Sequence, residues 1–432
     1  MSTISFCATG DSLITRRLST EDKSFKEIAS IIQSADVRFT NLEGTVHNLE
    51  GYPGAVSGGG WVMATPSMLK DLKEYRFNMI AWANNHTLDF TYGGLEATER
   101  NLNTLDFVHA GAGSNLARAS EPRYLELPSA RVALIAATSN FDRTWIAGAQ
   151  RPDIIGRPGI NPLRHHMTYT VSKEKLEQLK NIAKAIPVNA AYNILARRGF
   201  VQKNGDDLFF FGGIFFQEGL VEGECTEPNE NDMKRILSAI SEAKRQSDYV
   251  IVSIHSHQPK GENIEEPADF LVNFARRCVD EGAHCVIGHG PHILRGIEIY
   301  KDRPIFYSLG NFIFQCETLT HQPQDLYDRL GLGFYNNIAD ALDKQSDTIG
   351  FAEEPEVWES IIPFWEMRDG KLTELILHPI ELDNGILRHR RGCPKLSKSE
   401  KIIKKIAELS KPFGLSIESR DGIGKVIINQ KK

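Results

Sequence analysis

The sequence has no long apolar run, no cysteine-pairing motif and no excess of basic residues. No window approaches the roughly 18 apolar residues expected of a membrane-spanning helix. The six cysteines are scattered without a CxxC spacing, which argues against a disulfide framework or cysteine-held zinc and indicates reduced, apolar side chains. The net charge of −6 argues against a protein that binds nucleic acid or anionic lipid, because such proteins typically carry an excess of positive charge. Basic residues gather only locally, at 389–395 and 398–405.

The beginning of the chain also lacks a basic segment followed by an apolar run, so we expect no signal peptide and a cytoplasmic protein. The composition is otherwise ordinary, with 41% hydrophobic and 25% charged residues. At 432 residues, the chain is long enough for one large domain or two of average size.

Helical and strand patterns alternate along most of the chain, which predicts an α/β core. We expect this core at 1–144 and 229–316, interrupted by a Pro- and Gly-rich insertion at 145–228 that forms a lid or small subdomain. A second, polar insertion is expected at 317–358, followed by a β-rich extension and a last helix within 359–432. We expect the 145–228 insertion to determine substrate specificity.

Polar residues of the kinds that bind metals follow several of the predicted strands. Because ligands gather outside the carboxyl ends of strands in α/β sheets, residues far apart in sequence can meet there. Their carboxylates, amides and imidazoles suit one or two divalent ions such as Mn²⁺, Zn²⁺ or Fe²⁺. These candidates are Asp11, Asn41, Glu43, Asn85, His86, His255, His257, His289 and His292.

Each candidate also has a structural interpretation. The Gly-Asp pair at Asp11 is common in turns, and an asparagine at Asn85 can cap a helix. Of His255 and His257, we expect only His255 to point toward the other candidates, with His257 contacting substrate or lying at the surface. The other histidines are interpreted as ordinary: His47, His109, His165, His166, His284, His321, His378 and His389.

Several longer blocks resemble the CapA family of capsule-synthesis and poly-γ-glutamate-biosynthesis proteins. These are "ATGDSL", "TNLEGTV", "WANNHTLDFTYGGLEATERNL", "HAGAG", "VSIHSHQ" and "IGHGPHILRGIEIYKDRPIFYSLGNFIF". The resemblance covers 3–140 and 230–315 and, more weakly, 360–427. It implies the calcineurin-like metallophosphoesterase fold, a four-layer α/β/β/α sandwich carrying a dinuclear metal site.

The resemblance also implies roles for individual residues. The implied metal ligands are Asp11, Glu43, Asn85, His86, His255, His289 and His292. In the phosphoesterases, an Asn-His pair supplies one metal ligand and one group for the reacting oxyanion, and Asn85 and His86 match that pair in order. Asp89, three residues beyond His86, is expected to orient its imidazole.

Two divalent ions can share a hydroxide and stabilise charge on the reacting oxygen of a phosphoester or an amide. His86 or His257 is then a candidate to protonate the leaving group. We expect Arg16, Arg17 or Arg295 to bind an anionic substrate, with Arg295 favoured. Asn311 is expected near the site, either supporting a ligand or contacting substrate.

Three functions stay open at this point. The first is a metal-dependent hydrolase that uses a metal-activated hydroxide to cut a γ-glutamyl amide or a phosphoester. The second is a non-catalytic component of poly-γ-glutamate assembly that binds the polymer. The third is a scaffold without metal. The number of ligand-type residues at strand ends favours the first, and no nucleic-acid partner or membrane span is expected.

Overall fold

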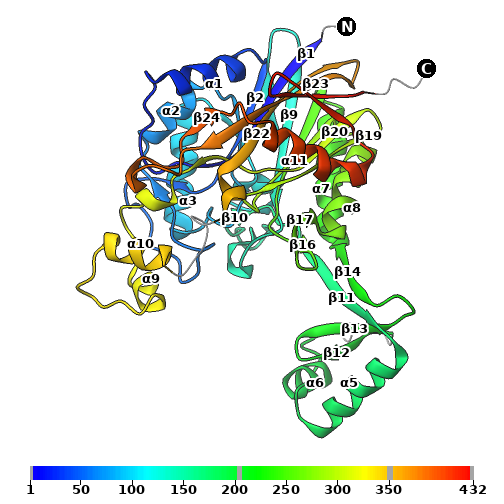
Figure 1. The fold of residues 1–432 in the computed structure, drawn as a ribbon. Helices are drawn as coiled ribbons and strands as arrows, with labels where there is room; N and C mark the ends of the chain where they lie inside the picture. The colour runs from blue at the N-terminus through cyan, green and yellow to red at the C-terminus, as the bar shows by residue number, and fades with distance from the viewer. Residues whose placement is uncertain (1–2, 202–206, 348–353, 429–432) are drawn as a thin grey trace.

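The computed structural model describes residues 3–201, 207–347 and 354–428. In this part of the chain two large β-sheets lie face to face, and helices cover the outer side of each (Figure 1). This confirms the four-layer α/β/β/α sandwich. No helix among the described residues has the length and apolar character needed to cross a membrane.

The first sheet has ten strands and combines strands from residues 4–110 with one at 311–314 and those of the C-terminal extension. Strands β1, β2, β5 and β6 are parallel, whereas β22 and β23 add to the β1 side in antiparallel fashion. Its strands are β1 (Ile4–Leu13), β2 (Val37–Leu42), β5 (Met79–Ala81), β6 (Val108–Ala110), β21 (Asn311–Phe314), β22 (Glu359–Arg368), β23 (Lys371–Leu382), β24 (Pro394–Leu396), β25 (Ile417–Arg420) and β26 (Ile423–Val426).

The second sheet has six strands in the order β19-β20-β18-β15-β9-β8. Its four central strands run parallel, and antiparallel strands close both edges. Its strands are β8 (Arg123–Glu126), β9 (Arg131–Thr138), β15 (Tyr249–His255), β18 (Cys285–His289), β19 (Leu294–Tyr300) and β20 (Arg303–Leu309).

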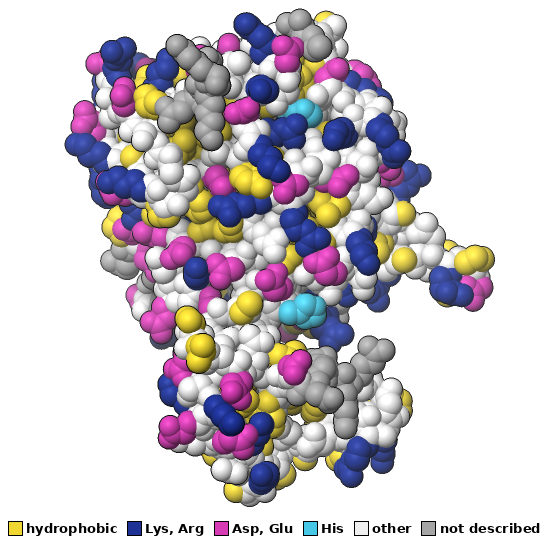
Figure 2. Space-filling model, turned by 90° about the vertical axis from the view of Figure 1, so that its right-hand side faces the viewer, with side chains coloured by type: hydrophobic (Ala, Val, Ile, Leu, Met, Phe, Trp, Pro, Cys, Tyr) yellow, Lys and Arg dark blue, Asp and Glu magenta, His cyan; other side chains and the backbone are white. Residues whose placement is uncertain are grey.

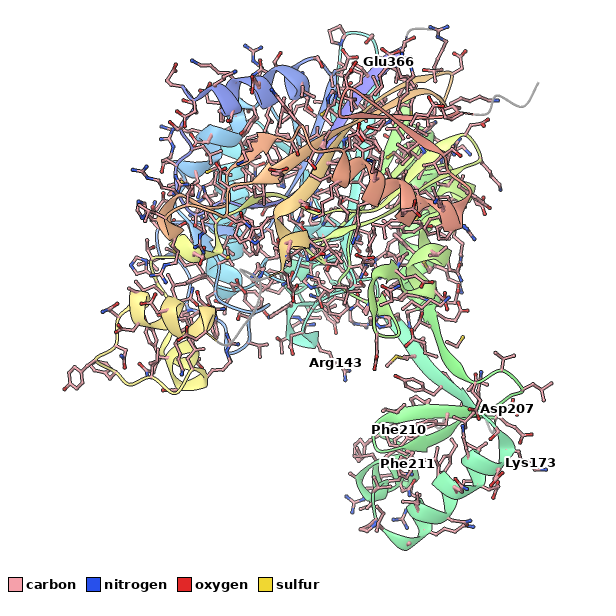
Figure 3. The ribbon with its side chains drawn as sticks, in the orientation of Figure 1. Arg143, Lys173, Asp207, Phe210, Phe211 and Glu366 are labelled. Atoms are coloured by element: carbon pink, nitrogen blue, oxygen red, sulfur yellow. The ribbon has the colours of Figure 1, made fainter. Side chains whose placement is uncertain are left out.

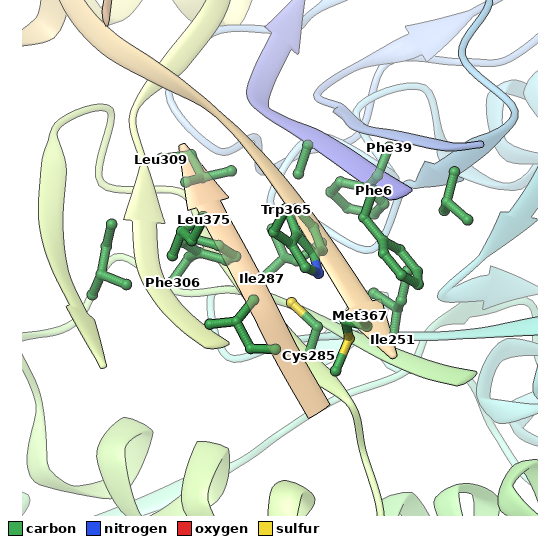
Figure 4. Close-up of a cluster of buried hydrophobic side chains, with 14 of the residues drawn as sticks. Phe6, Phe39, Ile251, Cys285, Ile287, Phe306, Leu309, Trp365, Met367 and Leu375 are labelled. Atoms are coloured by element: carbon green, nitrogen blue, oxygen red, sulfur yellow. The ribbon is translucent and has the colours of Figure 1, made fainter. Parts of the chain in front are cut away.

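The main hydrophobic core lies between the two sheets (Figure 4). Phe6 of β1 stacks on Trp365 of β22 with ring centroids 5.3 Å apart, and Phe306 of β20 packs against the same indole at 5.4 Å. Ile251 and Ile287 extend this layer from the central strands of the second sheet. Strands buried on both faces are near-continuous apolar runs, which is why these segments were recognisable in the sequence.

Helices complete the outer layers through apolar residues repeated at three- and four-residue spacing. Phe25, Ile28 and Ile32 of α1 face the first sheet, together with residues of α2 and α3. Helices α7 and α8 cover the second sheet. Helix α11 packs between β19 and the β25–β26 edge and adds Ile402, Ile403 and Ile406 to the core between the sheets. These helices are α1 (Lys23–Gln33), α2 (Met68–Glu74), α3 (Thr91–Thr104), α7 (Glu230–Lys244), α8 (Asp269–Glu281) and α11 (Glu400–Ser410).

A small subdomain projects from the core on two long paired strands (Figure 1). It consists of β11 (His165–Val171), α5 (Lys173–Ala185), α6 (Ala190–Arg197), β12 (Phe209–Phe211), β13 (Ile214–Glu218) and β14 (Gly223–Pro228). Phe210 packs between Tyr192 and Phe215, and Figure 3 shows it with Phe211 at a distance from the body of the protein. The projecting part begins at β11, because Trp145, Ile160 and Leu163 are buried in the core instead.

The described part of the second insertion contains two short α-helices at a different place on the core (Figure 1). They are α9 (Gln324–Arg329) and α10 (Ile338–Ser346). Smaller elements complete the chain, namely β3 (Thr45–Val46), β4 (Met63–Ala64), β7 (Ala112–Gly113), α4 (Leu116–Ser120), β10 (Gly159–Ile160), β16 (Pro259–Lys260) and β17 (Asn263–Pro267). On the face drawn in Figure 2, basic and acidic side chains are interspersed, in keeping with the modest net charge.

Candidate metal centre

The candidate residues meet where the parallel strands of both sheets end. Asp11 lies in β1 and is in register with Asn41 of β2 and Asn311 of β21. His255 ends β15 and His289 ends β18, and the two residues are directly in register across the second sheet. The facing sheets therefore bring these side chains to one common edge.

A first group of possible ligands consists of Asp11, His255 and His289, all of them buried. The Asp11 Oδ1 atom lies 3.7 Å from His255 Nδ1 and 3.5 Å from His289 Nδ1. The two Nδ1 atoms are 3.0 Å apart. One atom from each residue can therefore face a single cation, since all three lie within 4.8 Å of one another.

A second group consists of Glu43, His257 and His292. Glu43 Oε1 lies 3.8 Å from His292 Nε2 and 4.0 Å from His86 Nε2. His255 connects the two groups, because its Nε2 atom lies 3.8 Å from Glu43 Oε1 and 3.0 Å from His257 Nε2. The geometry thus offers two adjacent places for cations that share the imidazole of His255.

The expectation that His255 and His257 point in different directions is wrong. Residues two apart in a strand lie on the same face, and β15 already ends at His255. The chain turns after this residue and brings the His257 ring to a centroid distance of 5.0 Å from His255 and 5.5 Å from His292. His257 consequently belongs with the possible ligands of the second group rather than with the surface.

Hydrogen bonds behind the imidazoles orient them. His292 Nδ1 lies 2.9 Å from Asn311 Oδ1, and His289 Nε2 lies 2.6 Å from Ser253 Oγ. A proton on each of these nitrogens, donated to the oxygen, leaves the opposite nitrogen of each ring to face a carboxylate. Such partners are typical of metal-binding histidines. Ser253 was not predicted, since a serine inside an apolar strand gives no signal of this role.

Orphaned polar atoms indicate that the site suits cations. Both carboxylate oxygens of Glu43 and the Oδ1 atom of Asn85 are buried without a hydrogen-bond partner. Burying an unsatisfied polar atom costs free energy, and a buried charge must be paired or coordinate a metal. The Asp11 carboxylate is held differently, because its oxygens accept hydrogen bonds from Asn41 Nδ2 and from the backbone N–H of Gly290. Oxygen and imidazole donors of this kind fit Mn²⁺, Zn²⁺ or Fe²⁺.

Electrostatics support the same interpretation. Burial, reinforced by the Glu43 charge, raises the pKa of Asp11 to about 8, and burial raises the pKa of Glu43 to about 7. Burial also lowers the pKa of His289 to about 3 and the pKa of His255 well below its usual value. The protein alone therefore disfavours charge of either sign here, and divalent cations would restore the carboxylates to their ionised form.

The Asn84–Asp89 turn places a further histidine beside the two groups. The His86 Nδ1 atom lies 2.7 Å from Asp89 Oδ2, and the backbone N–H of His86 donates to Asn84 Oδ1. Burial lowers the pKa of His86, but the charge and hydrogen bond of Asp89, together with Glu43, outweigh it, and the pKa is raised. Asn84 stabilises the turn, because its Nδ2 atom donates to Leu42 O. The sequence does not distinguish this role from that of the neighbouring Asn85.

The arginines predicted to bind substrate are engaged elsewhere. Arg295 is fully buried, and its guanidinium donates to the backbone carbonyls of Ser256, His257 and Ile264. The expectation that Arg295 contacts substrate is therefore wrong. Its closeness in sequence to His292 does not determine the direction in which its side chain points. Arg16 donates to Arg390 O and lines a separate cavity, whereas Arg17 pairs with Asp71 at 2.6 Å.

A cavity of about 210 Å³ opens beside the candidate metal centre. His86, His257 and His292 form part of its wall, and side chains of the second insertion form much of the remainder. None of its lining residues comes from the described part of 145–228, so the insertion expected to determine specificity does not reach it. Only the positions of the two insertions on the core show which of them lines the cavity.

The fold and site define a four-layer α/β sandwich with buried groups that could bind metal, and comparisons identify the family. The chain belongs to the bacterial capsule synthesis protein family PGA_cap, whose model matches residues 5–316. It is 34% identical over 434 residues to an uncharacterized protein, y4sH, of Sinorhizobium fredii, covering 96% of this chain and 91% of that one. The family resemblance predicted from the sequence motifs is confirmed.

Two further comparisons are more distant. The capsule biosynthesis protein CapA of Bacillus anthracis is 24% identical over 251 residues, which is 58% of this chain and 43% of that protein. A putative 5'-nucleotidase from Staphylococcus aureus aligns in structure with a TM-score of 0.39 and 10% identity, covering 89% of this chain and 56% of that one.

Proposed function

We propose that this protein is a metal-dependent hydrolase that uses two divalent ions to cut a phosphoester or an amide such as a γ-glutamyl bond. One observation carries the proposal: two groups, each with a carboxylate and two imidazoles and with only His257 partly exposed, lie side by side at one sheet edge and are connected through His255. A scaffold without metal would gain nothing from burying six such side chains together, because each costs desolvation free energy.

In this proposal Asp11, His255 and His289 hold one ion, and Glu43, His257 and His292 hold the other. The ions would lower the pKa of a water molecule and stabilise negative charge on the reacting oxygen. The Oδ1 atom of Asn85, buried and lacking a hydrogen-bond partner, is available as an additional ligand.

His86 is the proposed proton donor to the leaving group. Its Nδ1 atom donates a hydrogen bond to Asp89, so the Nε2 atom points toward Glu43 and the cavity. The raised pKa of His86 keeps it protonated at higher pH than an ordinary histidine, which suits a general acid. Asp89 acts through His86 as a positioning residue and also accepts the backbone N–H of Val62.

Metal content and turnover test the proposal together. Protein dialysed against Mn²⁺ or Zn²⁺ should contain two ions per chain by elemental analysis, and it should hydrolyse members of a panel of p-nitrophenyl phosphates and γ-glutamyl amides. We expect His289→Ala to lose bound metal and turnover while keeping the fold. The exposed His389→Ala should lose neither. Full metal occupancy in His289→Ala would contradict the ligand assignment.

A non-catalytic role in polymer synthesis is the second candidate, and the family description as a capsule synthesis protein favours it. Such a component would bind poly-γ-glutamate at neutral pH without cutting it. Polymer binding together with no turnover under any metal would support this candidate and count against the hydrolase.

A further inference from the structure

The cavity beside the metal centre differs in character from the centre itself. Apart from the three histidines, its wall consists mainly of apolar side chains and the backbone of Gly58–Gly60. Leu13, Val62, Phe314 and Trp358 form one side and belong to a single hydrophobic cluster. Leu342 of α10 faces the same space. Small-molecule sites are commonly lined by apolar side chains with a few polar groups that fix orientation, and here the polar groups lie together at the histidine end of the cavity.

The charge of the wall excludes one kind of ligand. No lysine or arginine occurs among the described residues that line the cavity, and the only acidic residue besides the metal centre is Glu317. Glu317 is paired with Arg391 at 3.2 Å. Proteins that hold chains of carboxylates or phosphates use arginine and lysine for each anionic group. A polyanion would therefore meet no complementary charge beyond the metal ions.

The wall is firmly built. The side chain of Gln322 exchanges two hydrogen bonds with the backbone of Trp61, accepting from its N–H at 3.0 Å and donating to its carbonyl at 2.6 Å. Arg329 donates to the carbonyl of Gly59. Leu326 of α9 packs with Trp61 and Phe90 in a separate cluster. These contacts fix the second insertion against the 58–62 loop, so the cavity exists before any ligand binds.

We propose that this cavity binds an apolar group, an alkyl, acyl or aryl chain, attached next to the bond that lies at the metal ions. The substrate would then be a small amphiphile with one anionic head group rather than a polyanionic chain. This inference rests on the proposed function, since it takes the metal ions as the head-group site.

Binding of n-alkylphosphonates tests the inference without requiring turnover, because their C–P bond resists hydrolysis. A series from methyl to octyl is titrated by calorimetry into Mn²⁺-loaded full-length protein. We expect the dissociation constant to fall by up to about fourfold per methylene and then to level off when the cavity is full. An affinity that does not change with chain length, or tighter binding of a γ-glutamyl tetramer than of hexylphosphonate, would overturn the inference.

Two variants assign any chain-length effect to this cavity. Leu342→Asn should weaken hexylphosphonate binding and leave methylphosphonate binding unchanged, whereas Leu195→Asn, an exposed leucine of the projecting subdomain, should change neither. Ser346→Trp, at an exposed position of the rim, should fill the cavity and shorten the longest chain that still gains affinity. An unchanged profile in both cavity variants would overturn the assignment.

The outcome is separable from that of the proposed function. If no ester or amide is hydrolysed but affinity still rises with chain length, the hydrolase proposal fails and the apolar subsite is supported. If turnover is found and alkylphosphonate affinity is flat in chain length, the hydrolase stands and the subsite is refuted.

Discussion

At the scale of single residues, the site depends as much on buried supporting groups as on the possible ligands. Arg295 shows this most clearly. It is a large buried side chain that donates to the carbonyls of Ser256 and His257, in the segment that follows His255, and to the carbonyl of Ile264. Burial lowers its pKa to about 10, so it stays protonated at neutral pH. We infer that it positions the His255–His257 turn.

Replacing Arg295 with lysine should weaken metal binding. One ammonium group cannot reach three carbonyls in the fork geometry that the guanidinium satisfies, so the turn that carries His257 would loosen. We expect metal affinity to fall by roughly 10- to 100-fold, in the range seen when groups that orient ligands are removed. Competition with a chelator of known affinity measures the change.

Arg303→Lys is the matched control for this substitution. Arg303 also donates to two backbone carbonyls, those of Val279 and Ala283, but it lies away from the metal centre. It should lower thermal stability without altering metal affinity. Equal metal affinity in Arg295→Lys and the wild-type protein would contradict a role of Arg295 in positioning the ligands.

At the scale of elements, the centre depends on the close approach of β1 to the turn between β20 and β21. Asp11 N donates to Gly310 O at 3.0 Å, and Gly310 has a positive φ of 72°. A Cβ atom on Gly10 would lie 1.8 Å from Gly310 O, so only glycine fits there. In the Gly-Asp pair, the glycine is therefore required for packing and positions Asp11, and the aspartate is a possible ligand.

Gly10→Ala should therefore separate β1 from β21 and displace Asp11. We expect a loss of unfolding free energy of about 1–3 kcal/mol, typical of overpacking, together with reduced metal content. Urea denaturation and elemental analysis measure the two effects. Gly385→Ala, where an added Cβ would meet nothing within 4 Å, is the control and should change neither. Normal metal content in Gly10→Ala would show that Asp11 tolerates the shift.

The two insertions have different positions relative to the centre. The subdomain on β11 and β14 is anchored to the core by a hydrogen-bonded pair of ions, Arg164 and Asp232, at its base. The second insertion is instead held against the 58–62 loop, beside the cavity, by Gln322 and Arg329. We therefore expect substrate selectivity to depend on residues of α9 and α10.

At the scale of the whole molecule, neutral histidines that are buried or half-buried outside the candidate metal centre make stability depend on pH. Burial, with a smaller effect of Arg123, lowers the pKa of His109 to about 4, and burial lowers the pKa of His47 and His284 to about 4 as well. In the unfolded chain a histidine titrates near 6.5. As the pH falls from about 6.5 to about 4, the unfolded state takes up protons that the folded state refuses, so stability declines.

His109→Gln should reduce that decline. His109 is 4% exposed and contacts Asn103 Oδ1 at 2.9 Å, and a glutamine amide can occupy the same space without titrating. We expect the difference in unfolding free energy between pH 7 and pH 4.5 to shrink by about 2 kcal/mol relative to the wild-type protein. Urea denaturation at both values measures this, with the exposed His389→Gln as control. The same pH difference in His109→Gln and wild type would contradict a neutral buried His109.

Much of the framework follows from the sequence alone. Apolar strands such as 131–138 and 249–255 are continuous because both faces are buried, and the ligand-type residues follow them at the strand ends. The motifs around Asn85-His86 and His289-Gly-Pro-His292 identified the family and therefore the four layers. These features can be predicted from the sequence because a strand pattern or a motif extends over only a few consecutive residues.

Other features were decided only by the tertiary structure. The direction of His257 toward His292, the hydrogen bonds of Arg295 to backbone carbonyls and the support of His289 by Ser253 arise from contacts between segments far apart in sequence. The same holds for the apolar wall, where residues of 317–346, and none from the described part of 145–228, line the cavity beside the candidate site. A sequence records which donors and apolar groups exist, but their distances depend on how two sheets and their insertions pack, and that packing is a property of the whole chain.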